Sequence, residues 1–79
     1  MTIAFVLINT RFNEEVKDLE SVISELQAMT EVQEVKMVSG AYDLLLKLEV
    51  DSIHKIREIV ITNIRNQPYI ETTMTLIVM

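Results

Sequence analysis

The sequence predicts an α+β domain of the ferredoxin-like type, with the order β-α-β-β-α-β and both helices on one face of a four-stranded antiparallel sheet. Four segments rich in branched apolar residues are typical of strands, and two segments between them repeat apolar residues every three or four positions, as helices do. The chain has 79 residues, which is the size of one domain. We therefore interpret residues 1–79 as a single domain.

The first half of the chain contains a strand, a helix and a strand. Residues 3–8 are apolar at every position, which is typical of a strand covered on both faces. Asn13 is a good N-cap for a helix over residues 14–29, and two glutamates follow in its first turn, where the helix dipole favours acids. Residues 32–39 alternate apolar and charged side chains and predict a half-exposed strand. The apolar stripe of the first helix is Val16, Leu19, Ile23 and Leu26.

The second half repeats this order. Residues 42–50 predict the third strand, and Asp51 or Ser52 can cap a second helix. Pro68 ends this helix, because proline disfavours the helical conformation of the residue before it. Residues 70–79 predict the last strand. The apolar stripe of the second helix is Ile53, Ile56, Val60 and Ile64.

The strands carry more apolar side chains than one covered face can use. In the first strand Ile3, Phe5 and Leu7 point one way and Ala4, Val6 and Ile8 the other, and in the last strand Leu76 and Val78 oppose Ile77 and Met79. Each such side chain gains about 1.5–3 kcal/mol when it is buried. We therefore expect two copies to pack sheet to sheet as a homodimer, a dimeric α+β barrel.

Composition and charge exclude several kinds of function. Seven basic residues are scattered among twelve acids, and a net charge of −5 argues against direct binding of nucleic acid. The chain has no cysteine, which fits a cytoplasmic protein without thiolate metal sites. The apolar opening segment is too short to span a membrane and lacks a basic leader. The five methionines are expected to fill the core.

No catalytic site can be assembled from the sequence. His54 is the only histidine, and it is expected to be a solvated residue in the first turn of the second helix. No nucleophile–base pair, metal cluster or phosphate-binding loop is present. The sequence therefore predicts a protein that is not an enzyme and that needs no cofactor.

The hairpin between the second and third strands is the best candidate for a small-molecule site. It contains the only glycine, Gly40, followed by Ala41, Tyr42 and Asp43. Backbone N–H groups in a turn can hold a carboxylate, and glycine lets a ligand approach closely. Asp43 can accept an ammonium group, and Tyr42 can form a wall. Alternatively, Gly40 only supplies a positive φ and Asp43 only caps the turn.

Three stretches together resemble a known family. They are residues 4–8, the Ser-Gly-Ala-Tyr-Asp segment with its following apolar strand, and the threonine-rich residues 72–78. The chain resembles the C-terminal effector domain of the Lrp/AsnC transcription regulators, also called the RAM domain. Members usually carry a helix-turn-helix domain ahead of this one. Because Met1 is followed at once by the first strand, the chain is most similar to the free-standing members.

The resemblance implies a role in amino-acid sensing. It implies that dimers assemble into an octamer or a decamer and that a free amino acid binds between neighbouring dimers. It also implies that Thr72, Thr73 and Thr75 complete the pocket from a neighbouring subunit, and that a full-length Lrp/AsnC-type regulator is a possible partner. Many relatives have a charged or polar residue where this chain has Met74, so the identity of the ligand does not carry over.

Two other functions remain open from the sequence. The chain could be an interaction protein that binds no ligand and assembles with related regulators. It could also be a small enzyme, since dimeric barrels of this type house monooxygenases and isomerases, although the single histidine argues against this. Our hypothesis is the stand-alone amino-acid-binding module that modulates transcription of amino-acid metabolism.

Overall fold

The helices and strands follow one another in the predicted order. The structure, a computed structural model, describes residues 1–11 and 19–79. Within these residues no helix is long and apolar enough to cross a membrane. The elements are β1 (Thr2–Thr10), α1 (Leu19–Gln27), β2 (Val32–Met37), β3 (Leu44–Val50), α2 (Ile53–Ile59), the π-helical turn η1 (Val60–Ile64) and β4 (Ile70–Ile77).

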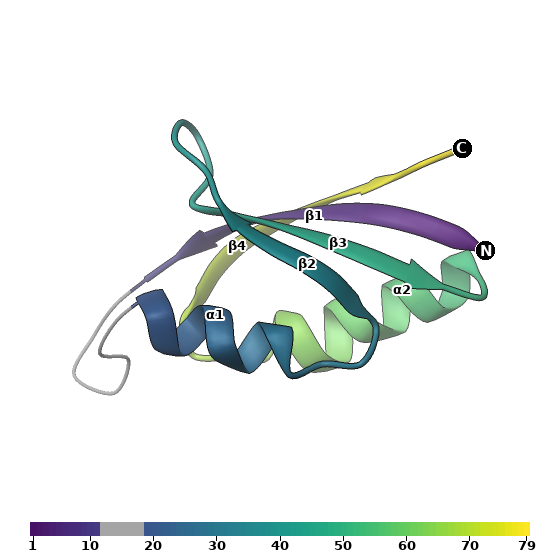
Figure 1. The fold of residues 1–79 in the computed structure, drawn as a ribbon, viewed down its shortest axis with the longest axis horizontal. Coiled ribbons are helices and arrows are strands. Elements are labelled where there is room, and N and C mark those ends of the chain that lie inside the picture. The colour runs from purple at the N-terminus through teal and green to yellow at the C-terminus, as the bar shows by residue number, and fades with distance from the viewer. Residues whose placement is uncertain (12–18) are drawn as a thin grey trace.

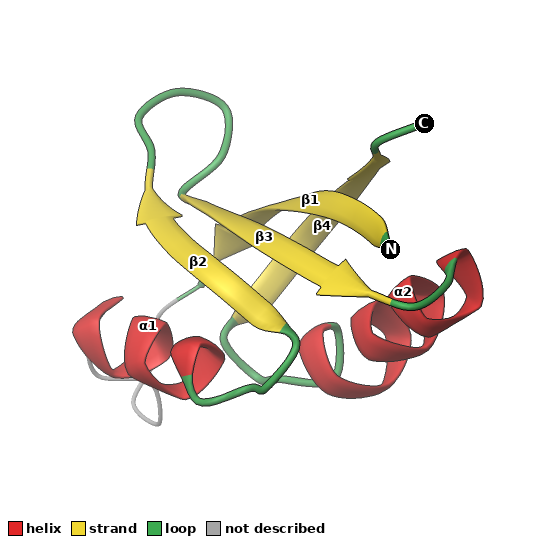
Figure 2. Ribbon diagram, turned by 45° about the vertical axis from the view of Figure 1, so that its right-hand side comes forward, coloured by secondary structure: helices red, strands yellow, loops and turns green. Residues whose placement is uncertain are grey.

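The four strands form one antiparallel sheet in the order β2-β3-β1-β4. The strand β1 therefore lies in the interior of the sheet, and β2 and β4 are its edges. Both helices lie on the same side of the sheet, and the loop between β2 and β3 projects from the other side (Figure 1). The same two layers are clear in the turned view (Figure 2). The predicted ferredoxin-like fold is confirmed.

The core lies between the sheet and the helices. In the antiparallel register Ile8 faces Leu44 and Val6 faces Leu46, so alternate residues of β1 and β3 share the helix-covered face. No polar or charged side chain is buried among the described residues. The fully buried side chains of these elements are Ala4, Val6 and Ile8 from β1, Leu44, Leu46 and Leu48 from β3, and Ile56 and Ile64 from the second helical segment.

The second helical segment begins at the predicted cap and ends in a wider turn. The backbone N–H of Lys55 donates to Ser52 Oγ at 3.3 Å, which satisfies one of the first free donors of α2. At the other end Arg65 N donates to Val60 O at 2.8 Å, five residues back, as in a π-helix. Ile59, the last residue of α2, is buried beside the predicted stripe.

Several element boundaries differ from those predicted. The strand predicted to reach residue 39 ends at Met37, and its partner begins at Leu44 rather than at residue 42. The last rung of this pair is the bond from Val38 N to Asp43 O at 3.0 Å, beyond which the two strands separate. The helix predicted over residues 14–29 ends at Gln27, and its predicted start and Asn13 lie outside the described residues. The last strand ends at Ile77 rather than at residue 79.

The expectation that the methionines fill the core was wrong. Met37 is 65% exposed, and Met1, Met74 and Met79 are exposed as well. Only Met29 packs against the core as a partly buried side chain. The reason lies in their positions, because Met1 and Met79 are at the chain ends and Met37 and Met74 lie on the edge strands of the sheet. The core is built instead from branched side chains.

The face of the sheet that the helices leave uncovered is apolar on one half only. On β4, Met74 and Leu76 lie opposite Leu7 and Phe5 of β1, and Leu76 is 50% exposed. On β3, by contrast, the outward positions opposite Phe5 and Ile3 are Lys47 and Glu49. We call the apolar half the outer patch. Its residues are Ile3, Phe5, Leu7, Leu45, Met74, Leu76 and Val78.

Candidate functional site

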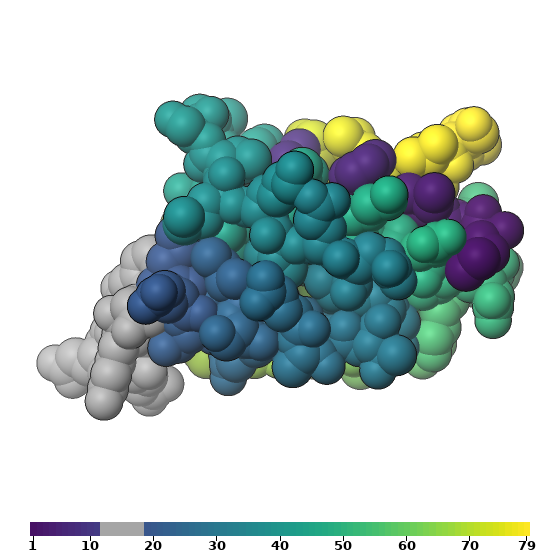
Figure 3. Space-filling model, viewed as in Figure 1, coloured from purple at the N-terminus to yellow at the C-terminus, as the bar shows by residue number. Residues whose placement is uncertain are grey.

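The candidate residues come from the hairpin loop and from β4, at one end of the sheet. The loop between β2 and β3 covers residues 38–43 and stands clear of the body of the molecule (Figure 3). Gly40 has φ +139°, a conformation that other residues rarely adopt. No atom lies within 4 Å of the place where a Cβ would be. The glycine is therefore needed for the turn, and the space beside it is open to a ligand.

Asp43 ties the loop to the neighbouring strand. Its Oδ2 accepts hydrogen bonds from Thr10 N at 2.8 Å and from Thr10 Oγ1 at 3.1 Å. The backbone N–H of Asp43 donates to Ile8 O at 2.9 Å. These bonds hold the base of the hairpin against β1. The contact with Thr10 joins residues 33 positions apart, so the sequence pattern gave no sign of it.

Tyr42 reaches across the sheet from the hairpin. Its hydroxyl donates to Met74 Sδ at 3.8 Å, a weak hydrogen bond to a thioether. Met74 belongs to β4, Tyr42 lies in the loop just before β3, and β1 lies between β3 and β4 in the sheet. The ring of Tyr42 therefore borders the end of the outer patch. From the sequence it was expected to form a wall of the hairpin site.

The three threonines do not share one face of β4. Thr72 lies opposite Asn9, and Asn9 Nδ2 donates to Thr72 Oγ1 at 3.1 Å on the uncovered face. Thr73 and Thr75 lie opposite Ile8 and Val6, so they are on the helix side. The structure thus brings Thr72 to the same face as Met74, the partner of Tyr42, and it turns Thr73 and Thr75 toward the helices.

A cavity opens where β4 begins. Its volume is about 430 Å³, within the range of small-molecule pockets. Two guanidinium groups, one carboxylate and two hydroxyls surround it, and Arg11 Nη2 donates to Ile70 O at 3.4 Å. We call it the β4 cavity. It is lined by Arg11, Arg65, Ile70, Glu71, Thr72 and Thr73. Both arginines are among the seven basic residues that are scattered along the sequence.

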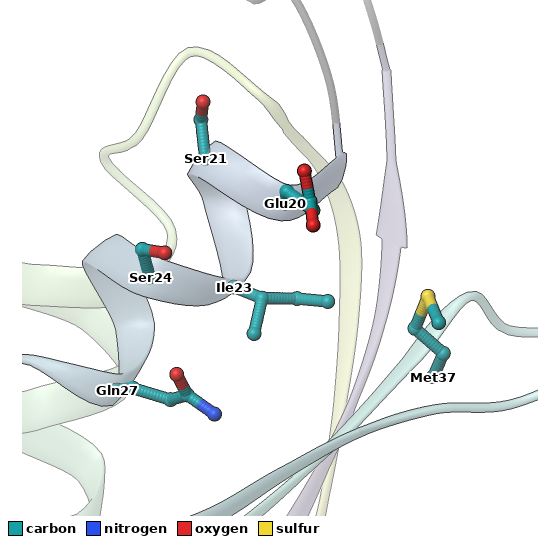
Figure 4. A pocket seen from close by; sticks show the side chains of 6 residues that line it. All are labelled: Glu20, Ser21, Ile23, Ser24, Gln27 and Met37. Atoms are coloured by element: carbon teal, nitrogen blue, oxygen red, sulfur yellow. The ribbon is translucent and has the colours of Figure 1, made fainter.

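A larger and shallower hollow of about 820 Å³ lies between α1 and the end of β2. Figure 4 shows Ile23 pointing across it toward Met37, with Glu20 and Gln27 at its border. Within residues 1–11 and 19–79 no cluster of three metal-binding side chains occurs. His54 is exposed, as expected.

Tyr69 is the one described residue whose acidity the fold clearly changes. Burial of its ring, the negative charge of Glu25 and a hydrogen bond to that carboxylate raise its pKa from 10.0 to about 12. The fold therefore favours the neutral phenol. The neutral Tyr69 phenol therefore stabilises the folded state. This contribution to the free energy of unfolding is complete below pH 10, where the unfolded chain also keeps the proton, and it is lost as the pH rises through about 12.

We expect an absorbance titration to show a tyrosine that ionises only near pH 12. The free energy of unfolding, measured with urea, should fall between pH 10 and pH 12. Tyr69→Phe should remove the late step, and Glu25→Gln should move it to lower pH. A late step that survives in Tyr69→Phe would contradict this assignment.

Comparison with known proteins agrees with this fold. Residues 3–79 match the family model of the Lrp/AsnC ligand-binding domain. The chain is 35% identical over 63 residues to the proline dehydrogenase transcriptional activator of Rhizobium radiobacter. This match covers 80% of the chain and spans about 40% of the length of that curated relative.

Solved structures show the same similarity over the whole chain. The crystal structure of FFRP-DM1 has a TM-score of 0.87 and 35% identity, and the match covers 100% of both chains. The structure of Escherichia coli AsnC has a TM-score of 0.84 and 28% identity over 98% of this chain and 50% of that one. The fold is that of a regulatory ligand-binding domain. The chain belongs to the Lrp/AsnC ligand-binding domain family, which is not a family of enzymes.

Proposed function

We propose that this chain is a cytoplasmic amino-acid-binding module that modulates transcription of amino-acid metabolism. The observation that carries the proposal is the match of residues 3–79 to the Lrp/AsnC ligand-binding domain. The related activator of Rhizobium radiobacter is named for proline dehydrogenase, an enzyme of amino-acid metabolism. Proline is for this reason the first effector to test.

Assembly is the second part of the proposal. Exposed apolar residues on an otherwise folded surface mark an interaction site, and the outer patch is such a surface. Two copies that pack these patches together around a two-fold axis form a homodimer. Four or five such dimers then form the octamer or decamer. A full-length Lrp/AsnC-type regulator is the proposed partner, and direct contact with DNA is not part of the proposal because the net charge is −5.

The effector site is proposed at the end of the sheet, with Gly40, Ala41, Tyr42 and Asp43 from one subunit. Thr72, Thr73 and Thr75 are proposed to contribute from a neighbouring subunit. The open space beside Gly40 supports this placement. The hydrogen bond from the Tyr42 hydroxyl to Met74 Sδ, which holds the ring at the border of the outer patch, supports a wall for the ligand side chain. Binding shifts assembly only if the effector prefers one assembly state over another.

A thermal-shift screen of the twenty amino acids at millimolar concentration tests the proposal. We expect at least one, with proline tested first, to raise the melting temperature, because a ligand at a hundred times its Kd adds about 2.7 kcal/mol to the free energy of unfolding. The D-enantiomers of the active compounds serve as controls. If none of the twenty stabilises the protein, the interaction protein without a ligand becomes the better assignment.

A further inference from the structure

The β4 cavity contains charges that fit both ends of a free amino acid. Arg11 and Arg65 bring two guanidinium groups to it, and Glu71 brings one carboxylate. An arginine fork matches the geometry of a carboxylate, and a carboxylate accepts an ammonium group. Thr72 and Thr73 add two hydroxyls that can donate or accept. The cavity is thus polar and of mixed charge, with one net positive charge.

The side chain first expected to take the ammonium group is already used within the chain. Asp43 Oδ2 accepts two hydrogen bonds from Thr10, and these bonds hold the hairpin in place. A ligand ammonium on this oxygen would compete with both of them. Glu71 is exposed, and within residues 1–11 and 19–79 it forms no ion pair. Its carboxylate is the better placed of the two acids to receive a cation.

We propose that the β4 cavity binds the charged groups of the effector, with its carboxylate on Arg11 and Arg65 and its ammonium on Glu71. This inference rests on the proposed function and changes the assignment of the charged groups within that site. Thr72 connects the β4 cavity with the uncovered face of the sheet. It lines the cavity, and its hydroxyl also accepts a hydrogen bond from Asn9 on that face. The hairpin then shapes the space for the ligand side chain instead of holding the charges.

The charge of the cavity separates an amino acid from other anions. Inorganic phosphate and acetate carry no ammonium group, so Glu71 repels both of them. A zwitterion gains from both kinds of charge, so the cavity is expected to prefer an amino acid to acetate.

NMR titration of the whole chain with the most stabilising amino acid, with acetate and with inorganic phosphate tests the proposal. Arg65→Gln is expected to weaken amino-acid binding by about tenfold or more, and Arg65→Lys is expected to lose less. Arg57→Gln is the matched control, since it removes the same charge from α2, away from the cavity. Unchanged melting temperatures of the free variants show that they fold.

Glu71→Gln gives the sharpest distinction, because its effect should change direction with the probe. It is expected to weaken amino-acid binding and to strengthen acetate binding, since it removes both a partner for the ammonium and a repulsion of the anion. If amino acids bind and Arg65→Gln or Glu71→Gln leaves their affinity unchanged, the cavity assignment is wrong and the proposed function stands. If no amino acid binds the wild-type protein, the proposed function itself fails.

Discussion

Replacing Leu76 with glutamate is expected to convert the assembled protein into single chains. Leu76 is half exposed in the single chain and lies opposite Phe5 in the middle of the outer patch. In a dimer packed through this patch, the new carboxylate would be buried without a partner, which costs several kcal/mol. In the single chain it meets water. Sedimentation of wild type and Leu76→Glu at micromolar concentration measures the difference.

The helix side of the molecule offers a matched control. Ile61 belongs to η1 and is 58% exposed, slightly more than Leu76, but it lies on the other layer. Ile61→Glu is expected to leave the mass of the dimer unchanged. A wild-type protein that sediments as a single chain, or a Leu76→Glu variant that stays dimeric, would contradict packing through the outer patch.

Replacing Ile56 with alanine is expected to cause the largest loss of stability. Ile56 has no exposed surface and packs between α2 and the sheet. Removing a buried isoleucine side chain to the β-carbon typically costs about 2–5 kcal/mol, because burial is lost and a cavity remains. This is a large share of the roughly 5–15 kcal/mol by which small domains are stable. Urea unfolding at a fixed protein concentration measures it.

Ile53 provides the comparison on the same helix. It is one turn earlier and 37% exposed, so alanine at this position leaves a smaller cavity and loses less burial. We expect Ile53→Ala to cost less than half as much as Ile56→Ala. Equal losses in the two variants would mean that the helix does not pack against the sheet in the orientation described here.

The secondary structure was accessible from the sequence because its signals are local. The three-residue and four-residue spacing of Ile53, Ile56, Val60 and Ile64 defines a helix face without reference to the sheet. The last three are buried as expected, but Ile53 is 37% exposed. Ser52 was one of two possible caps, and the bond from Lys55 selects it. The π-helical turn was not predicted, since no local pattern distinguishes it from the end of an α-helix.

The candidate site was predicted less completely, because its contacts join distant parts of the chain. Thr10 and Asp43 are 33 residues apart, and Asn9 and Thr72 are 63 apart. Arg11 and Arg65 are scattered in the sequence. The pairing of β1 with β4 brings Arg11 to the start of β4, where Arg65 already lies because it follows η1 and precedes that strand. No spacing in the sequence could have indicated this cluster.

Alternation along each strand and the spacing along each helix determined the order of the elements and the existence of a second apolar face. These properties depend on neighbours in the chain, so the sequence alone contains them. The strand order and register decided that this face is apolar mainly over β1 and β4, since Lys47 and Glu49 occupy two of the outward positions of β3 and only Leu45 extends the patch onto that strand. They also decided that the arginines meet at the start of β4, because pairing between strands is a property of the folded chain.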